Sequence, residues 1–302
     1  MKTGMGVRLR THAKLNLFLR VLGARPDGFH EVETILQGIN LYDEFEIVPR
    51  KGAIEVAMQL ASGRSGDLPD PSENLIHLAA QRLSEHHPGT VGADIRVVKG
   101  IPIGAGLGGG SGNAAGTLVV LSDLWGTELE RADLVGLARE LGSDVPFCID
   151  GGVALATERG EKITQLASPD VEMWFVLGGM SYPLSSRSVY EAWDSLPDKT
   201  TDGPPSASFT LALGAGDLVE VGAHLHNDLE AAAFSLRGEL EGKKEKMAAA
   251  GVLGAAMTGS GPTMFGLLED RDGARAAAAR VEDDFDWVEV VSSRSDCIER
   301  LD

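Results

Sequence analysis

The stretch IPIGAGLGGGSGNAAGTLVVLSDLW, residues 101–125, joins a glycine-rich segment to a helix-forming one. Glycine permits positive φ angles and removes the side chains that would keep an anion away from the backbone. A helix N-terminus adds unpaired N–H groups and a dipole that favour negative charge, and Ser111 is predicted to open this helix. The segment therefore favours a phosphate-binding loop. A flexible linker and a tight packing loop without a ligand are the alternatives.

Two widespread nucleotide motifs fit this loop poorly. Gly104, Gly106 and Gly109 satisfy G-x-G-x-x-G. In a dinucleotide-binding fold this motif follows the first strand of the domain, whereas here a β-rich region of nearly 100 residues precedes it. Asp123 has roughly the spacing of a ribose contact, yet it lies inside the predicted helix. A Walker P-loop is excluded because G-K-[ST] occurs nowhere in the sequence.

Composition indicates a soluble globular protein of 302 residues, 43% hydrophobic and 24% charged. Its net charge of −18, from 45 acidic and 27 basic residues, argues against nucleic acid or an anionic membrane as a partner. The sequence contains no apolar run of membrane-spanning length and no signal peptide, so a cytoplasmic location is expected. Cys148 and Cys297 match no metal or redox spacing.

The hydrophobic pattern predicts the elements that would position the loop. Leu15, Leu17 and Leu19 alternate with polar or aromatic residues, which predicts a half-buried strand. Further strands are expected at residues 29–38, 43–49, 93–100, 151–158, 161–166, 171–179, 254–269 (two strands around a glycine turn) and 287–294. Helices are expected at residues 72–87 (capped by Ser72 or Asn74), 111–126, 131–142, 185–196, 216–234, 236–251 and 274–285, with a polar loop at 198–208. Strands and helices mix without strict alternation, which favours two α+β halves that meet near residue 165.

Four stretches, in the expected order, carry a resemblance to a known family. The motif P-x-G-x-G-L-G-G-G-S-x-x-A-A between a strand and a helix is similar to that of the GHMP superfamily of small-molecule kinases. AKLNLFLRVLGARPDGFHEVETI (13–35), LGSDVPFCIDGGVALATERGEKI (141–163) and MTGSGPTMFGLLED (257–270) resemble its 4-diphosphocytidyl-2-C-methyl-D-erythritol kinase family. The first is the most discriminating, because other superfamily members rarely pair A-K-x-N with R-x-D-G-[YF]-H.

The resemblance implies a two-domain α+β GHMP kinase fold. Residues 1–165 would form a domain like ribosomal protein S5 domain 2, with the glycine-rich ATP loop, and residues 166–302 a ferredoxin-like domain. The implied reaction is ATP-dependent phosphorylation of the 2-hydroxyl of 4-diphosphocytidyl-2-C-methyl-D-erythritol, in the methylerythritol phosphate route to isoprenoid precursors. The cofactors would be ATP and Mg²⁺, with no ligands assigned to the metal. A small-molecule partner and a monomer or weak homodimer are expected, without nucleic acid or membrane.

The resemblance also assigns residues to the site. Lys14 and Asp144 match the catalytic pair, in which the aspartate takes the proton of the acceptor hydroxyl and the lysine keeps that aspartate ionised. A solvated turn for Asp144 and a solvent-facing strand position for Lys14 are the alternatives. The ATP loop comprises Pro102, Ile103, Gly104, Ala105, Gly106, Leu107, Gly108, Gly109, Gly110, Ser111 and Gly112.

Substrate contacts are implied at five positions. Phe29 and His30 match the pair that stacks on and hydrogen-bonds to cytosine, although Phe29 replaces a more usual tyrosine and so lacks its hydroxyl. Asn16 and Lys99 are expected to contact substrate or phosphate, and Tyr190 to form a second aromatic wall. The competing functions are another GHMP kinase, of the homoserine or mevalonate type, and a non-catalytic nucleotide-binding sensor on the same fold; a sensor would have no use for a catalytic base.

Overall fold

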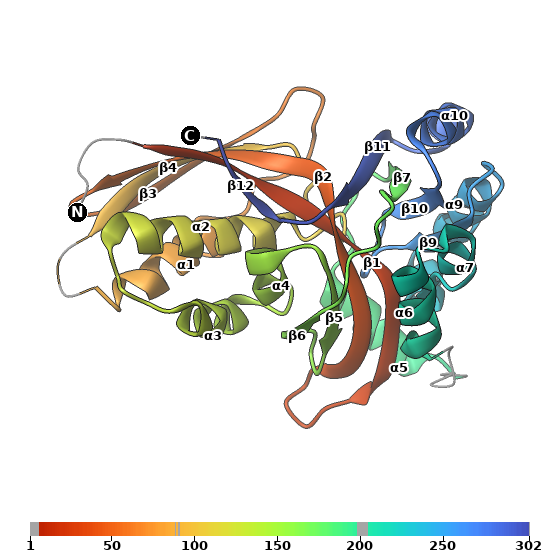
Figure 1. The fold of residues 1–302 in the computed structure, drawn as a ribbon, viewed down its shortest axis with the longest axis horizontal. Helices are drawn as coiled ribbons and strands as arrows, with labels where there is room; N and C mark the ends of the chain where they lie inside the picture. The colour runs from red at the N-terminus through yellow and green to blue at the C-terminus, as the bar shows by residue number, and fades with distance from the viewer. Residues whose placement is uncertain (1–5, 88, 90, 198–204, 302) are drawn as a thin grey trace.

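A long antiparallel hairpin crosses the computed structural model, which describes residues 6–87, 89, 91–197 and 205–301 (Figure 1). Its strands are β1 (Val7–Ala24) and β2 (His30–Arg50). The sequence predicted two strands where β2 is one, at 29–38 and 43–49, and this prediction was wrong. No glycine or proline separates the two predicted segments, so the chain stays extended through them.

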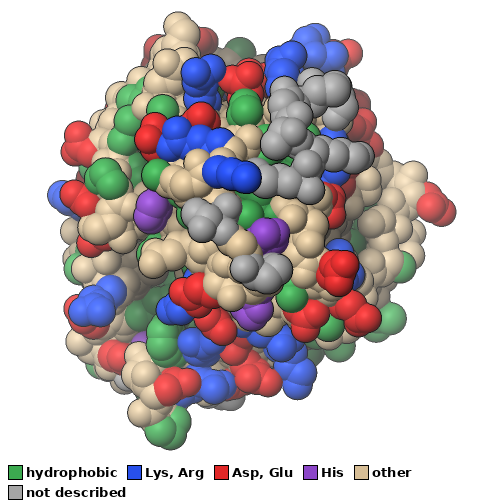
Figure 2. Space-filling model, turned by 90° about the vertical axis from the view of Figure 1, so that its left-hand side faces the viewer, with side chains coloured by type: hydrophobic (Ala, Val, Ile, Leu, Met, Phe, Trp, Pro, Cys, Tyr) green, Lys and Arg blue, Asp and Glu red, His purple; other side chains and the backbone are tan. Residues whose placement is uncertain are grey.

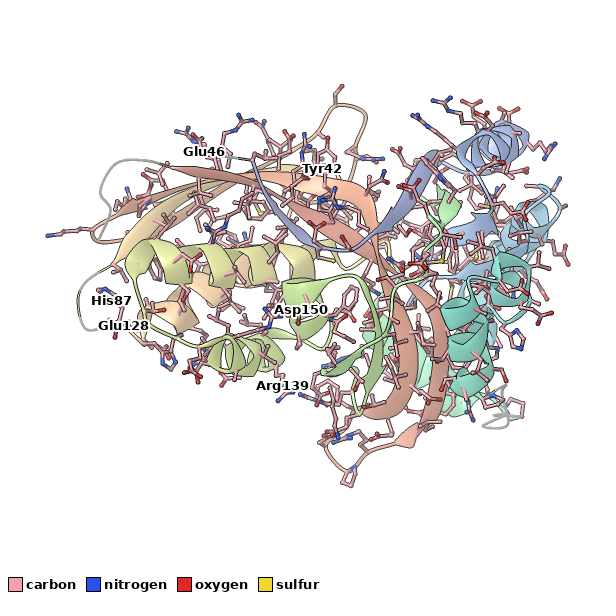
Figure 3. The ribbon with its side chains drawn as sticks, viewed as in Figure 1. Tyr42, Glu46, His87, Glu128, Arg139 and Asp150 are labelled. Atoms are coloured by element: carbon pink, nitrogen blue, oxygen red, sulfur yellow. The ribbon has the colours of Figure 1, made fainter. Side chains whose placement is uncertain are left out.

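Two of the three shifts of register between β1 and β2 flank the segment that contains residues 14 and 16. His12 pairs with Tyr42 (labelled in Figure 3) but Ala13 pairs with Ile39, so two residues of β2 bulge out. A second shift of register follows between Asn16 and Phe18. Such bulges re-aim the side chains beside them. Residues 14 and 16 lie between the two irregularities and, two apart on one strand, share a face.

The hairpin organises one sheet of 12 strands, whose main path runs β12-β1-β2-β11-β7-β10-β9. The remaining strands branch from this path: β4 pairs with β2 and β3, β5 with β2 and β6, and β8 with β1. Their bounds are β3 Ile54–Leu60, β4 Gly92–Lys99, β5 Val153–Thr157, β6 Lys162–Gln165, β7 Trp174–Gly179, β8 His226–Asn227, β9 Gly254–Met257, β10 Met264–Leu268, β11 Trp287–Arg294 and β12 Ile298–Arg300. Because β11 and β12 return to the N-terminal hairpin, both chain halves build this sheet. The division near residue 165 stays a prediction.

Helices gather in two groups on either side of the hairpin (Figure 1). In the left-hand group of that view, the helices lie beneath the sheet and enclose an apolar core that includes Trp125 and Phe147. This group is α1 Leu75–Ser84, α2 Gly109–Trp125, α3 Arg131–Leu141 and α4 Val145–Asp150. The right-hand group is α5 Ser186–Ser195, α6 Ser206–Ala215, α7 Leu218–Ala223, α8 Glu230–Leu236, α9 Glu239–Ala248 and α10 Arg271–Val281, with a 3₁₀ turn at Glu282–Asp284. Of the two caps predicted for α1, Ser72 and Asn74, the structure shows Asn74, whose side chain accepts the backbone N–H of Ile76.

One helix prediction and one loop prediction in the second half were wrong. The helix expected at 216–234 is divided into α7, β8 and α8, because the Asn227 side chain bonds backbone groups of other segments. Its amide donates to the carbonyls of Met257 (2.6 Å) and Gly259 (2.8 Å), which competes with helical hydrogen bonding. The loop expected at 198–208 contains the start of α6 at Ser206, and residues 198–204 lie outside the described part.

The hydropathy of the helices and the distribution of surface charge are described next. None of the described helices has the length and apolar character of a membrane span. On the face that Figure 2 presents, basic and acidic side chains are interspersed, so no broad basic patch forms there.

Candidate active site

Two cavities adjoin at the glycine-rich loop. The smaller, about 350 Å³, lies between the loop, the start of α1 and the end of β4. The larger, about 800 Å³, extends from the loop along the hairpin to α5. Gly106, Gly108 and Ser111 line both cavities. Groups bound in the two cavities would therefore meet at this loop.

Helix α2 presents its first turn to the smaller cavity. It begins at Gly109, after Gly108 in the left-handed region (φ 70°), and not at Ser111 as the sequence predicted. The difference arises because a glycine in this conformation starts the helix without a capping side chain. The N–H groups of the first turn are thus left for an anion, as the phosphate-binding interpretation requires.

The loop glycines also serve tight packing. A Cβ at Gly106, where φ is +77°, would lie 2.6 Å from the carbonyl oxygen of Thr258. A Cβ at Gly108 would lie 2.9 Å from Cγ of Lys14, whose backbone N–H donates to Leu107 at 3.0 Å. The loop is therefore held against β1 and against the second glycine turn, residues 259–261, which excludes a flexible linker. The packing interpretation describes this geometry, and phosphate binding by the same loop stays a prediction.

The loop between α3 and α4 brings Asp144 to Lys14. Asp144 precedes the first turn of α4, and its carboxylate caps no backbone N–H of that helix. Its Oδ2 lies 3.3 Å from Lys14 Nζ. Lys14 is 3% exposed, whereas the Asp144 side chain is 32% exposed and lines the larger cavity. Both alternatives, the solvent-facing lysine and the purely solvated turn, disagree with this geometry.

A buried polar network holds Lys14 in place. Lys14 Nζ donates to Asn16 Oδ1 at 2.6 Å, and Asn16 Nδ2 donates to Thr34 Oγ1 at 2.9 Å. Thr258 Oγ1 accepts the backbone N–H of Asn16 at 3.0 Å. The sequence analysis missed Thr34 and Thr258. Thr258 directly precedes the glycine turn in the MTGSG stretch, but only the packing of that turn against the first loop gives it a role.

Lys99 lies on the smaller cavity, not beside the other expected substrate contacts. Its ammonium, 5% exposed, pairs with the fully buried Asp43 and donates to Asn113 Oδ1 at 2.8 Å. Asp43 also accepts the backbone N–H groups of Gly100 (2.8 Å) and Ile101 (2.9 Å). Burial lowers the pKa of Lys99 against the opposing charge of Asp43. A phosphate contact by Lys99 stays a prediction.

Aromatic residues line the far end of the larger cavity. The rings of His30 and Tyr190 stack with centroids 4.6 Å apart, and His30 Nε2 lies 3.1 Å from Asp194 Oδ1. Burial, and secondarily the charge of Asp144, raises the pKa of the Tyr190 hydroxyl, which stays neutral at ordinary pH. Phe29 is 51% exposed, with the Arg159 guanidinium carbon 4.9 Å from its ring centroid.

Family models match both parts of the chain. The model described as "GHMP kinases N terminal domain" matches residues 74–152, and "GHMP kinases C terminal" matches residues 210–286. The chain is 42% identical to the 4-diphosphocytidyl-2-C-methyl-D-erythritol kinase of Pelotomaculum thermopropionicum over 278 residues, 91% of this chain and 94% of the relative. The chain belongs to the 4-diphosphocytidyl-2-C-methyl-D-erythritol kinase family.

Solved structures agree with this membership. A crystal structure of 4-(cytidine 5'-diphospho)-2C-methyl-D-erythritol kinase matches with a TM-score of 0.76 and 33% identity, covering 95% of this chain and 98% of the other. Homoserine kinase from Cytophaga hutchinsonii has the same TM-score at 20% identity, covering 100% and 99%, a likeness of fold alone. The two-domain α+β GHMP kinase fold expected from the sequence is confirmed. The chain is an ATP-dependent small-molecule kinase.

Proposed function

We propose that the chain transfers the γ-phosphoryl group of ATP to the 2-hydroxyl of 4-diphosphocytidyl-2-C-methyl-D-erythritol. The observation that carries this proposal is the junction of two cavities at one glycine loop, with a lysine–aspartate pair on the wall of the larger cavity. A phosphate donor in the smaller cavity and an acceptor in the larger one would be in line across that loop. Family membership supports the identity of the acceptor.

The smaller cavity suits the phosphates of ATP. Its loop offers backbone N–H groups at a helix start that no side chain caps. Such neutral donors matter in a protein with a net charge of −18, where the overall field opposes a polyanion. Residues 102–112 are proposed as the ATP loop. Mg²⁺ accompanies ATP in this proposal and neutralises phosphate charge; its ligands are not assigned, and the described residues contain no cluster of three or more His, Cys, Asp or Glu fit to hold a metal.

In the proposed mechanism, Asp144 accepts the proton of the acceptor hydroxyl as the oxygen attacks phosphorus. Lys14 pairs with this carboxylate at 3.3 Å and stabilises the charge that develops on the transferred group. Asn16 fixes the lysine ammonium through its 2.6 Å hydrogen bond. Preorganisation of this kind is effective because the buried groups need not rearrange during the reaction.

Recognition of the cytidine end is proposed for three aromatic residues. Phe29 offers a half-exposed ring for stacking, and His30 a ring nitrogen for the base edge. Tyr190, stacked on His30, forms the second wall. If the acceptor were homoserine or mevalonate, the aromatic end of the cavity would have no role. If the protein were a non-catalytic sensor, the Lys14–Asp144 pair would have none. We also propose a cytoplasmic monomer or weak homodimer divided into residues 1–165 and 166–302.

A substrate panel tests the proposal. Purified protein with Mg²⁺ and ATP is assayed for ADP release with the cytidine conjugate, the matching uridine conjugate, homoserine and mevalonate. We expect turnover with the cytidine conjugate and a lower kcat/KM with the uridine conjugate. Faster turnover of homoserine or mevalonate would overturn the acceptor while leaving the kinase assignment standing. No ADP release with any acceptor, at demonstrated ATP binding, would favour the sensor.

A further inference from the structure

Helix α5 runs beside the larger cavity and connects its two ends. At its start, Ser186 Oγ lies 3.0 Å from Ser260 Oγ, on the second glycine turn. A Cβ at the preceding Gly259 would lie 3.5 Å from Lys14 Nζ, so this end adjoins the catalytic pair. Near the other end, Asp194 meets His30 of the aromatic end. Eight residues of helix span about 12 Å.

Arg187 follows Ser186 directly in the first turn of this helix, so it lies nearer the catalytic pair than the aromatic end. It lines the larger cavity, three residues before Tyr190 and seven before Asp194, a spacing that places all three on one helix face. An acceptor that joins a nucleoside to a polyol through a diphosphate would extend along the helix, with its base at His30 and its reacting hydroxyl at Lys14. Its diphosphate would then lie between them, and the phosphate group that adjoins the polyol would lie closest to Arg187.

The charges around the cavity distinguish Arg187 from its other cations. Lys14 is paired with Asp144 at 3.3 Å, and Arg159 with Glu161 at 3.2 Å. Arg187 lines the same cavity as Lys14 and Arg159, but among the described residues it forms no ion pair. The cavity wall also carries four carboxylates, Asp27, Asp144, Glu191 and Asp194. A polyanionic acceptor therefore needs a cation whose charge is not already neutralised.

We propose that the Arg187 guanidinium binds the diphosphate of the acceptor and so contributes to the affinity of the enzyme for that acceptor. This inference rests on the proposed function and names a determinant of acceptor binding outside the stretches that carry the family resemblance. A guanidinium suits the task because its planar donors bind two phosphate oxygens at once, which an ammonium cannot do.

The test compares two ligands that differ only in the diphosphate. Dissociation constants of cytidine 5'-diphosphate and of cytidine are measured by calorimetry for wild type, Arg187→Ala and Arg187→Lys. Arg187→Ala is expected to weaken binding of the diphosphate about tenfold or more and to leave cytidine unchanged, since a charge-assisted hydrogen bond is lost. Arg187→Lys should recover part of the loss. In turnover, KM for the acceptor should rise by a similar factor, with kcat and the KM for ATP within about threefold of wild type.

The control is Arg275→Ala on α10. Arg275 is an exposed helical arginine, its replacement makes the same change in net charge, and it lines neither of the two cavities. It should alter none of these constants. Equal effects of Arg187→Ala on both ligands, or none on either, would overturn the role of Arg187 while the wild-type enzyme still phosphorylates the conjugate. A rise in the KM for ATP alone would assign the guanidinium to the donor and also overturn the proposal. Failure of wild type to phosphorylate the conjugate would instead remove the proposed function.

Discussion

Two buried lysines flank the glycine loop, and their replacement by methionine should have opposite consequences. Lys14 is paired with an aspartate that water still reaches, whereas the partner of Lys99 is fully buried. Methionine keeps the apolar stem of either side chain and removes only the charge. The two variants therefore compare a charge placed for chemistry with a charge placed for stability.

For Lys14→Met we expect a large loss of turnover with little loss of stability. Two unit charges 3.3 Å apart interact by about 5 kcal/mol at an effective dielectric constant of 20. If half of an interaction of this size is realised only in the transition state, turnover falls about 100-fold. The free energy of unfolding should change by only about 1 kcal/mol, because the freed Asp144 carboxylate, at 32% exposure, regains water.

For Lys99→Met we expect the reverse. The substitution removes the cationic partner of Asp43, which is 0% exposed. Loss of one partner of a buried ion pair lowers the free energy of unfolding by about 3–5 kcal/mol. Urea unfolding of wild type and both variants gives the stabilities, and steady-state kinetics below the unfolding transition gives the turnover. A stability loss for Lys14→Met as large as that for Lys99→Met would refute the reasoning, as would wild-type turnover in Lys14→Met.

Three further perturbations test other parts of the site. Gly106→Ala should lower the free energy of unfolding by about 2 kcal/mol and also lower activity, because the new Cβ would lie 2.6 Å from a carbonyl oxygen at a residue in the left-handed conformation. The control Gly110→Ala, whose Cβ would lie 3.6 Å from its nearest neighbour, should unfold like wild type in urea. His30→Ala should reduce kcat/KM for the cytidine conjugate about tenfold to 100-fold and narrow the preference over the uridine conjugate; an unchanged preference would remove His30 from base recognition. Burial, and secondarily the charge of Arg294, lowers the pKa of His12 from 6.5 to about 4. As the pH falls from 6.5 towards 4, the unfolded chain therefore binds a proton at His12 that the folded chain does not, and the free energy of unfolding decreases. Between pH 7 and pH 5, wild type should lose about 2 kcal/mol more than His12→Gln in urea unfolding, and equal losses would contradict this.

The sequence predicted most of the parts and little of their mutual placement. The glycine loop, its helix and the motif around Asp144 were visible because each combines special backbone residues with a nearby periodic pattern. Lys14 and Asp144 were paired through the family resemblance, since residues 130 positions apart have no local signal of contact. The contact between Gly106 and Thr258 was equally invisible, because it depends on how two loops from distant segments pack.

The wrong local predictions have tertiary causes. Ser111 is a good capping residue, yet the helix begins at Gly109, after Gly108 at the N-cap, because the loop packs closely against β1. The helix expected at 216–234 has a suitable apolar pattern, but the Asn227 side chain interrupts it through hydrogen bonds to the second glycine turn and the end of β9. Arg187 was not singled out at all. Its charge matters only because α5 lies along the larger cavity.

The central proposal is that the hydroxyl of a cytidine-linked polyol is phosphorylated at the Lys14–Asp144 pair. The most direct measurement is ³¹P NMR of reactions containing ATP, Mg²⁺ and the cytidine conjugate, with wild type and with Asp144→Asn in parallel. We expect a new phosphomonoester signal on the 2-hydroxyl with wild type, formed at least 100-fold more slowly by Asp144→Asn while ATP binding is retained. A phosphate on another hydroxyl, or equal rates for the two proteins, would contradict the proposal.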